Sequence, residues 1–245
     1  MALVEEANLL ERLNEMEAHE LLAWAAAEYG DRAGIFTSFQ NTGCVMTDMA
    51  HRAGAPLRIL TVDTLRLPDE TYALMAAIES RYDTTIERFQ PEPDAVERMV
   101  SRHGEYLFFD SKEKQEYCCN IRKVEPNIRA LQTVEVWITG LRRDQSSFRK
   151  DAVQKASYVD QEGRRIIKLA PLADWTEQEV WDYIKKNDVP YSKLYDLGYT
   201  SIGCKICTTP TLKWEDKRAG RWRWLNYLDP SAKKECGIHL GGSGI

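Results

Sequence analysis

The stretch GIFTSFQNTGCVMTDMAHRAG, residues 34–54, contains the change from strand to helix on which the predicted fold rests. Residues 34–39 form a short, mostly apolar run, which predicts a buried strand. Residues 43–54 follow as a predicted helix that ends at Gly54. A strand followed at once by a helix is the repeating unit of an α/β sheet.

The same alternation continues along the chain. Strands are also predicted over residues 57–64, 84–89 and 134–140, and helices over residues 68–82, 93–104 and around 124–132. Strands that alternate with helices imply parallel pairing through crossover helices. The predicted fold class is therefore α/β, an open, mostly parallel sheet with helices on both faces. Such sheets bind ligands at the carboxyl ends of their strands.

The segments on either side of this alternation have other patterns. Residues 4–29 repeat apolar positions at helical spacing, and Gly30 is a stop signal. Past residue 140 the chain is polar and basic; residues 164–175 then predict a short strand and a turn, and 176–188 a helix with a capping box. We expect one domain over residues 1–245. Its parts are an N-terminal helical segment (1–30), an α/β nucleotide-binding core (31–190) and a C-terminal extension folded onto the sheet (191–245).

Composition limits the class of protein. Apolar residues make up 43% of the 245 residues, charged residues 29%, and the net charge is -5, which does not favour general binding to nucleic acid. No apolar run reaches the roughly 20 residues of a membrane helix, and the acidic N-terminus does not resemble a secretory signal. We expect a cytoplasmic protein. In a reducing compartment, six cysteines favour metal ligands or catalytic thiols over disulfides.

Four of the cysteines form two pairs that could share one metal centre. Cys118 and Cys119 are adjacent, and Cys204 and Cys207 form a CxxC turn. Four thiolates can hold a zinc ion or an iron–sulfur cluster. Neighbouring side chains on a helix point about 100° apart, which suits a cubane better than one small ion, so we favour a [4Fe–4S] cluster. The alternative is a set of ordinary buried cysteines. Lys123, one helical turn after the pair, would approach the negative cluster, or is a solvated lysine.

Polar residues follow the first two predicted strands and indicate a nucleotide site. The loop after residue 36 offers hydroxyl and N–H groups at the start of a helix, where an anion is favoured. It is not a Walker A loop, because GKS and GKT are absent from the sequence. The predicted substrate contacts in these two loops are Ser38, Thr42, Gly43, Asp63, Thr64 and Arg66.

Two basic clusters in an acidic protein indicate a local anion site. GLRRDQSSFRK (140–150) contains Arg142 and Arg143, and KRAGRWRW (217–224) contains Arg218 and Arg221. The planar guanidinium group suits phosphate and sulfate oxygens. A solvated basic loop is the alternative for the first cluster, and the mixture of arginine and tryptophan in the second is also found in proteins that bind single-stranded nucleic acid.

Together with the terminal KKECGIHL (233–240), these motifs resemble the assimilatory adenylyl-sulfate reductases of the adenylyl-sulfate and phosphoadenylyl-sulfate reductase family. The similar motifs are the CC pair, the CxxC turn, GLRRDQS and PLADWTEQEVWDYI, and the resemblance covers residues from about 36 to 240. It implies an adenine nucleotide α-hydrolase-like fold, and a nucleophilic Cys236. It also implies that the cluster is a [4Fe–4S] cluster with the ligands Cys118, Cys119, Cys204 and Cys207.

The implied reaction reduces adenylyl sulfate to sulfite and AMP in sulfate assimilation and cysteine biosynthesis. The thiolate of Cys236 would attack sulfur and form an S-sulfonate, with basic neighbours lowering the pKa of the thiol. His239 would orient the tail or the substrate. The tail would then move out to a separate reductant, thioredoxin or glutaredoxin, which releases sulfite. We expect no nucleic acid and no membrane as partner, and a homo-oligomer is left open.

Two loops depart from the family pattern. A segment that commonly reads SFGAED is SFQNTG here, residues 38–43, and the usual LDTG is VDTL, residues 62–65. The paired cysteines usually accompany the use of adenylyl sulfate, and relatives without them usually prefer the 3′-phosphorylated nucleotide. Because the two loops depart from the pattern, a phosphoadenylyl-sulfate reductase or an enzyme of dual specificity is the first alternative. The others are an ATP-using adenylating or tRNA-thiolating relative and an iron–sulfur or zinc regulatory protein that binds nucleic acid.

Overall fold

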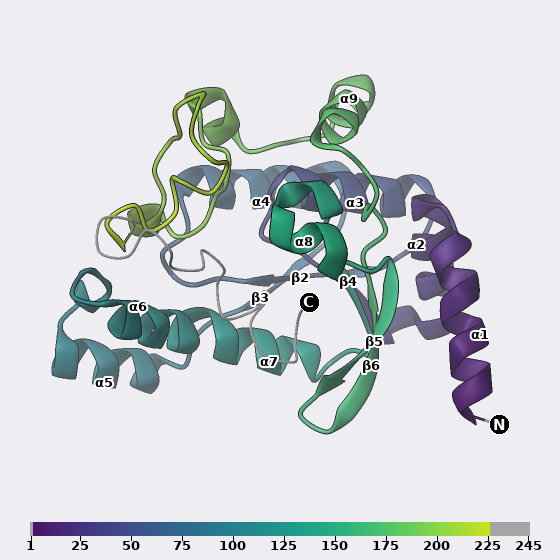
Figure 1. The fold of residues 1–245 in the computed structure, drawn as a ribbon, viewed down its shortest axis with the longest axis horizontal. Coiled ribbons are helices and arrows are strands. Elements are labelled where there is room, and N and C mark those ends of the chain that lie inside the picture. The colour runs from purple at the N-terminus through teal and green to yellow at the C-terminus, as the bar shows by residue number, and fades with distance from the viewer. Residues whose placement is uncertain (1, 226–245) are drawn as a thin grey trace.

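The computed structural model describes residues 2–225, with side chains from residue 5 on except those of residues 147 and 148. Six strands in this part form one sheet in the order β3-β2-β1-β4-β6-β5, with helices on both faces (Figure 1). All neighbours pair in parallel except β5, which runs antiparallel to β6 at one edge. The predicted fold class is confirmed.

The elements follow the predicted alternation. The strands are β1 Ala33–Phe36, β2 Arg58–Val62, β3 Ile86–Phe89, β4 Val136–Thr139, β5 Ala156–Gln161 and β6 Arg164–Leu169. The α-helices are α1 Ala2–Glu15, α2 Ala18–Tyr29, α3 Asn41–Arg52, α4 Asp69–Tyr82, α5 Pro93–His103, α6 Lys112–Cys119, α7 Glu125–Leu131, α8 Ser147–Ala152 and α9 Glu177–Asn187.

Several local features differ from the sequence prediction, and helices α6 and α8 were not predicted. The helical pattern over residues 4–29 is two helices, because Glu17 starts α2 with a capping box in which its backbone N–H donates to Glu20 Oε2 at 2.8 Å. Strand β5 was not predicted. It forms a hairpin with β6 through Glu162 and Gly163, both at positive φ (52° and 79°), as a two-residue hairpin turn requires. Because the first of these residues is a glutamate, the turn lacks the usual Asn-Gly or Asp-Gly signal.

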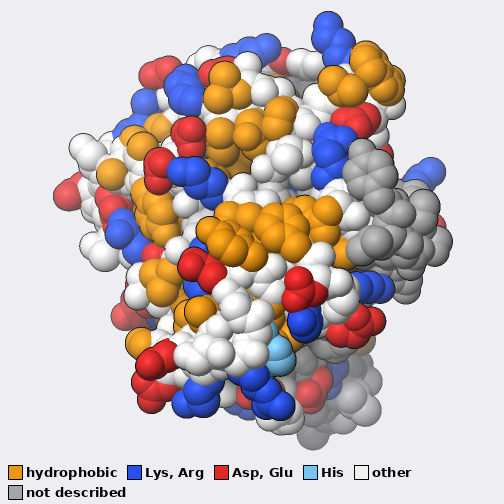
Figure 2. Space-filling view, turned by 90° about the vertical axis from the view of Figure 1, so that its left-hand side faces the viewer, with side chains coloured by type: hydrophobic (Ala, Val, Ile, Leu, Met, Phe, Trp, Pro, Cys, Tyr) orange, Lys and Arg blue, Asp and Glu red, His pale blue; other side chains and the backbone are white. Residues whose placement is uncertain are grey.

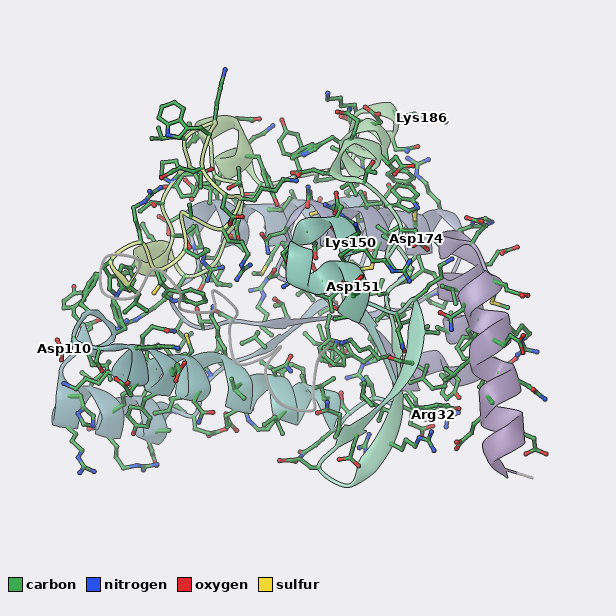
Figure 3. The ribbon with its side chains drawn as sticks, in the orientation of Figure 1. Arg32, Asp110, Lys150, Asp151, Asp174 and Lys186 are labelled. Carbon is green, nitrogen blue, oxygen red and sulfur yellow. The ribbon has the colours of Figure 1, made fainter. Side chains whose placement is uncertain are left out.

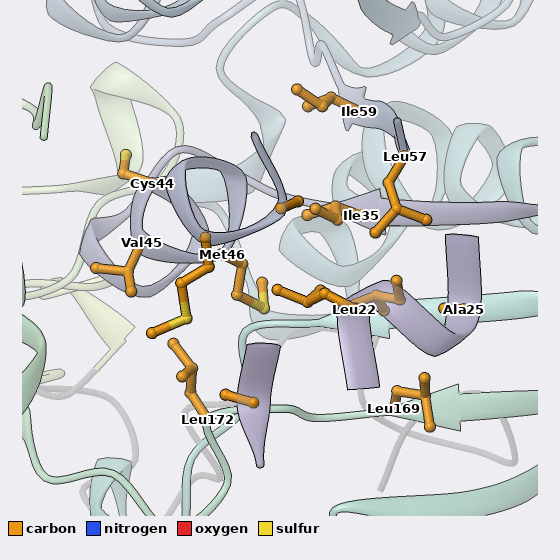
Figure 4. Packing of buried hydrophobic residues seen from close by; sticks show 14 of the residues in the cluster. Leu22, Ala25, Ile35, Cys44, Val45, Met46, Leu57, Ile59, Leu169 and Leu172 are labelled. Atoms are coloured by element: carbon orange, nitrogen blue, oxygen red, sulfur yellow. The ribbon is translucent and has the colours of Figure 1, made fainter. Parts of the chain in front are cut away.

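The two faces of the sheet are buried differently. On one face, side chains of α2, α3, α4 and α9 pack against Ile35, Ile59 and Ile138 in the largest apolar cluster (Figure 4). On the other face, Phe36 and Trp137 pack with Leu131 and neighbouring side chains near α7. No helix within residues 2–225 is long and apolar enough to cross a membrane.

One buried carboxylate joins three helices on the first face. The Asp48 side chain, 1% exposed, accepts hydrogen bonds from Arg52 Nε at 2.6 Å, Tyr82 Oη at 3.0 Å and Tyr183 Oη at 2.8 Å. Burial and this carboxylate raise the pKa of both tyrosines. The group therefore fixes α9, from the C-terminal half of the chain, to α3 and α4.

Replacing this carboxylate is expected to destabilise the protein. Asp48→Ala leaves the phenol groups of buried Tyr82 and half-buried Tyr183 without their acceptor, so we expect the free energy of unfolding to fall by about 3 kcal/mol. Urea denaturation followed by circular dichroism measures it. The control is Glu135→Ala, which removes the exposed ion pair with Arg32 (Figure 3) and should change the value by less than about 1 kcal/mol. Equal losses in both variants would contradict the role of Asp48.

Candidate active site

The strand order reverses between β1 and β4. From β1 the chain builds outward through β2 to β3, and it then returns to place β4 on the other side of β1. The loops after β1 and β4 diverge from such a point and leave a crevice at the carboxyl ends of the strands. A cavity of about 260 Å³ lies there, lined by both loops, by side chains of the sheet and by residues of the C-terminal extension.

Most of the described residues that the sequence singled out for substrate line this cavity. The lining residues among them are Ser38, Thr42, Gly43, Thr64, Arg142, Arg218 and Arg221. Lys123, predicted to lie beside a cluster, also lines it. Cys236 and His239 lie outside the described residues.

Two of the predicted contacts after β2 lie elsewhere. Asp63 is buried and accepts hydrogen bonds from Tyr72 Oη at 2.7 Å and Gln90 Nε2 at 3.0 Å, so it fixes the end of β2. Arg66 donates to the Glu105 carbonyl at 3.0 Å and lines the cysteine cavity described below. The structure therefore gives these side chains other partners than a ligand in the substrate cavity.

Arg143 also lies outside the cavity lining. Its guanidinium group forms an ion pair with Asp174, which Figure 3 labels near α8, and it donates to the Val153 carbonyl at 2.9 Å. Arg142, one residue earlier, is in extended backbone and is 3% exposed. Arg143 begins a 3₁₀ turn, and of the two arginines only Arg142 lines the cavity.

The loop after β1 satisfies much of its own backbone. The N–H of Phe39 donates to Thr37 Oγ1 at 2.9 Å, that of Thr42 to Asn41 Oδ1 at 2.8 Å, and that of Asn41 to Tyr195 Oη at 3.2 Å. These N–H groups are thus already paired, unlike those of an open phosphate cradle.

Gly43 is needed here for packing. A Cβ atom at this position would lie 2.0 Å from Thr37 Oγ1 and 2.9 Å from Thr37 Cβ. The glycine therefore lets the first turn of α3 approach the end of β1.

Buried guanidinium groups supply the positive charge of the cavity. Arg142 Nη1 donates to Thr42 Oγ1 at 2.9 Å and Nε pairs with Asp144 at 2.9 Å. Arg221 is 5% exposed, and its Nε and Nη2 atoms have no hydrogen-bond partner among the described residues. A buried charged donor without an acceptor is costly, so the cavity favours an anionic ligand beside Arg221.

The cavity also has an apolar floor, which the sequence did not predict as part of the site. In the register of β1 with β2 and β4, Phe36 lies beside Leu60 and on the same face as Trp137. The rings of Phe36 and Trp137 pack edge to face, with centroids 6.1 Å apart, and all three residues line the cavity. Read from the sequence, they are strand residues with the pattern of ordinary core side chains, and only their position at the crevice makes them candidates for contact with a base.

The four predicted cysteine ligands come together next to this cavity. Cys118 and Cys119 end α6, which continues as a single π-helical turn, Asn120–Val124. A short 3₁₀ turn, Lys205–Cys207, presents the CxxC cysteines. All four thiols line one narrow cavity with Arg122 and Lys123, and Lys123 also lines the substrate cavity. The π turn therefore places one lysine between the two.

The environment of the thiols is mixed. Burial raises the pKa of Cys207 to about 12 and raises that of Cys118, against the charges of Arg66 and Arg122. Burial opposes ionisation of Cys204 too, but the charge of Lys123 and a hydrogen bond with Thr64 outweigh it and lower the pKa. In the described part of the chain, no three Cys, His, Asp or Glu side chains form a group that could hold a metal ion. That finding supports neither a zinc site nor a cluster among the described residues.

Donor chemistry at the cysteine cavity fits an anionic group held by thiolates. Arg122 is 6% exposed; its Nη1 donates to the Thr64 carbonyl at 3.0 Å, and its Nε has no partner among the described residues. Cys119 Sγ accepts from Gln115 Nε2 at 3.0 Å. Cationic and neutral donors thus surround the sulfur atoms.

Aromatic packing attaches the extension beside this cavity. The face on the left of Figure 1 carries a band of hydrophobic side chains in its middle (Figure 2). Trp224 of the extension packs on Phe109 with ring centroids 4.5 Å apart, and its Nε1 donates to the Phe108 carbonyl at 3.1 Å. This contact holds the chain that follows the CxxC turn against the segment before α6.

Comparison with known proteins gives a consistent result. Residues 33–210 match the family model described as the phosphoadenosine phosphosulfate reductase domain. The adenosine 5'-phosphosulfate reductase of Allochromatium vinosum is 42% identical over 92% of this chain and 85% of its own length. That of Burkholderia cepacia is 40% identical over 92% and 88%.

A solved structure agrees with this result. Phosphoadenylyl-sulfate reductase from Candida auris, crystallised as a phosphate complex, is similar with a TM-score of 0.69 and 30% identity, over 82% of this chain and 96% of that one. This chain therefore belongs to the phosphoadenosine phosphosulfate reductase family.

Proposed function

We propose that this chain reduces adenylyl sulfate to sulfite and AMP, with electrons from thioredoxin or glutaredoxin. The observation that carries the proposal is the position of the cavity: it lies at the reversal of strand order and is lined by buried guanidinium groups. Lys123 connects it to four cysteines. The names of the two bacterial relatives support adenylyl sulfate as the substrate.

The cavity suits the two ends of such a nucleotide. In our proposal the adenine packs on the floor of Phe36, Leu60 and Trp137, since a flat apolar ring is best buried against other apolar groups. The phosphosulfate lies toward Arg221 and Lys123, where cationic donors converge. Further cations for the phosphate come from Arg142 and Arg218.

The proposed chemistry needs a thiolate, for which Cys236 is the candidate. Its sulfur attacks the sulfur of adenylyl sulfate, the bond from that sulfur to the bridging phosphate oxygen breaks, and AMP leaves with the electron pair. The enzyme then carries an S-sulfonate. A thiolate of the reductant attacks Cys236 Sγ, sulfite leaves, and the second thiol of the reductant resolves the mixed disulfide. The two electrons thus come from one dithiol.

The same proposal gives the four paired cysteines a [4Fe–4S] cluster. Thiolates are the usual ligands of such clusters, and the four thiols line one narrow cavity. The cluster would supply fixed charge and structural order at the end of the substrate cavity. Lys123, Arg66 and Arg122 would offset its negative charge.

A serine in place of Cys236 should abolish the covalent intermediate. After anaerobic incubation with adenylyl sulfate and no reductant, intact-protein mass spectrometry should show one added sulfonate on the native chain and none on Cys236→Ser. Reduced thioredoxin should remove it. An adduct that persists in Cys236→Ser would assign the attack to another residue, and no adduct on the native chain would exclude this route.

Loss of one paired cysteine should remove the cluster. Anaerobically purified native protein should hold about four iron atoms per chain, and Cys204→Ser should hold far fewer. Cys44 is the matched control, because it is fully buried in the main core and lines neither cavity. Cys44→Ala should keep its iron. Zinc in place of iron, or equal loss in both variants, would refute the assignment.

Substrate preference separates the leading proposal from its alternative. We expect kcat/KM to be at least about tenfold higher for adenylyl sulfate than for the 3′-phosphorylated nucleotide, a difference of about 1.4 kcal/mol in transition-state binding. The steady-state rate of sulfite release with reduced thioredoxin measures both. A higher value for the 3′-phosphorylated compound would make the chain a phosphoadenylyl-sulfate reductase.

A further inference from the structure

Gln40 occupies the N-cap position of α3 but does not cap the helix. Short polar side chains are preferred at an N-cap because they accept a hydrogen bond from the first turn. Instead, Gln40 Oε1 accepts a hydrogen bond from the backbone N–H of Ile202 at 3.0 Å. Gln40 Nε2 donates a hydrogen bond to Ser38 Oγ at 3.2 Å. It therefore connects the β1–α3 loop to the C-terminal extension.

The same extension caps the helix that Gln40 leaves uncapped. Tyr195 Oη accepts from the N–H of Asn41 at 3.2 Å, and the tyrosine ring packs edge-on against Trp181 with centroids 5.0 Å apart. Two successive residues of the loop, Gln40 and Asn41, thus bond to two points of the extension. A local preference is given up for a contact between distant parts of the chain, which is a mark of a functional position.

The contact at Ile202 leads directly to Arg221. At the next residue, Gly203, a Cβ atom would lie 2.3 Å from Arg221 Nη2 and 2.5 Å from Cζ. The Cζ atom of the same group lies 4.6 Å from the ring centroid of Trp222. The guanidinium group thus packs closely against the backbone of Gly203 and also contacts a tryptophan ring. The location of that backbone decides where the guanidinium group lies.

We propose that Gln40 is a positioning residue of the substrate site, which fixes Arg221 through the backbone of Ile202 and Gly203. The inference rests on the proposed function, in which Arg221 holds the phosphosulfate. Gln40 stands where the common family pattern SFGAED has a glycine, which has no side chain to make this bond. Gln40 lines the cavity, so the alternative to be tested is direct contact with the substrate.

A double-mutant cycle with Gln40→Met and Arg221→Met separates these two roles. If Gln40 acts through Arg221, Gln40→Met should raise KM for adenylyl sulfate about tenfold and change kcat less than about twofold. In the Arg221→Met background the same substitution should change KM by less than about twofold, because the group that it positions is gone. A full tenfold effect in that background, or no effect in the native one, would overturn the proposal.

The matched control is Gln178→Met. Gln178 is exposed on α9, donates to Asp182 at 2.8 Å and lines neither cavity. Its kinetic constants should equal those of the native chain. Thermal unfolding of all variants checks that Gln40→Met does not act by general destabilisation.

Hydrogen exchange tests the first link of the proposal without any substrate. The Ile202 amide should be protected in the native chain, and its exchange should be at least about tenfold faster in Gln40→Met and unchanged in Gln178→Met. Equal exchange in the native chain and Gln40→Met would overturn the proposal. Because this readout needs no turnover, a native chain that fails to reduce adenylyl sulfate would refute the proposed function separately.

Discussion

The reversal of strand order at β1 and β4 is the constraint on which the rest of the structure depends. Parallel pairing brings the carboxyl ends of five strands to one edge, and the reversal makes two neighbouring loops leave that edge in opposite directions. The resulting crevice lies between loops whose backbones are fixed by the buried sheet. It can therefore collect polar side chains from distant parts of the sequence without weakening the apolar cluster on the opposite face.

Charge in this crevice is buried, and its cost explains the local architecture. Arg142 is compensated by Asp144 and by the hydroxyl of Thr42, and Arg122 by the Thr64 carbonyl. Arg221 Nε and Nη2 have no hydrogen-bond partner among the described residues. In our proposal, the anionic substrate accepts hydrogen bonds from this guanidinium group. The cavity is in this sense built around charge that a ligand neutralises, which gives it affinity and selectivity for anions.

The C-terminal extension depends on the core for its shape. Its described part has short 3₁₀ turns and an isolated bridge between Thr208 and Arg221 in place of long regular elements. It is fixed by individual bonds to the core, such as Lys205 N–H to the Arg66 carbonyl at 2.8 Å. Cys204, Cys207 and Arg221 consequently take their positions from the loops that they cover. This couples the cysteine cavity to the substrate cavity.

Much of the fold and part of the site were determined by the sequence alone. Alternating apolar segments predicted the α/β sheet and most helices within a few residues, because burial of strands and helix faces is a local property of the pattern. The residues of the two cysteine pairs were identifiable from their type and spacing. The hairpin of β5 and β6 and the break at Glu17 were not, since each rests on a turn or cap with an uncommon residue.

Only the tertiary structure decided which of the candidate side chains face the cavity. Arg142 lines it and Arg143 pairs with Asp174; Thr64 lines it and Asp63 fixes the end of β2. Phe36 lines the cavity because it is the last residue of β1, at the edge of the sheet where the crevice lies. The direction of a side chain depends on the backbone conformation at its residue, and residue type does not record that direction.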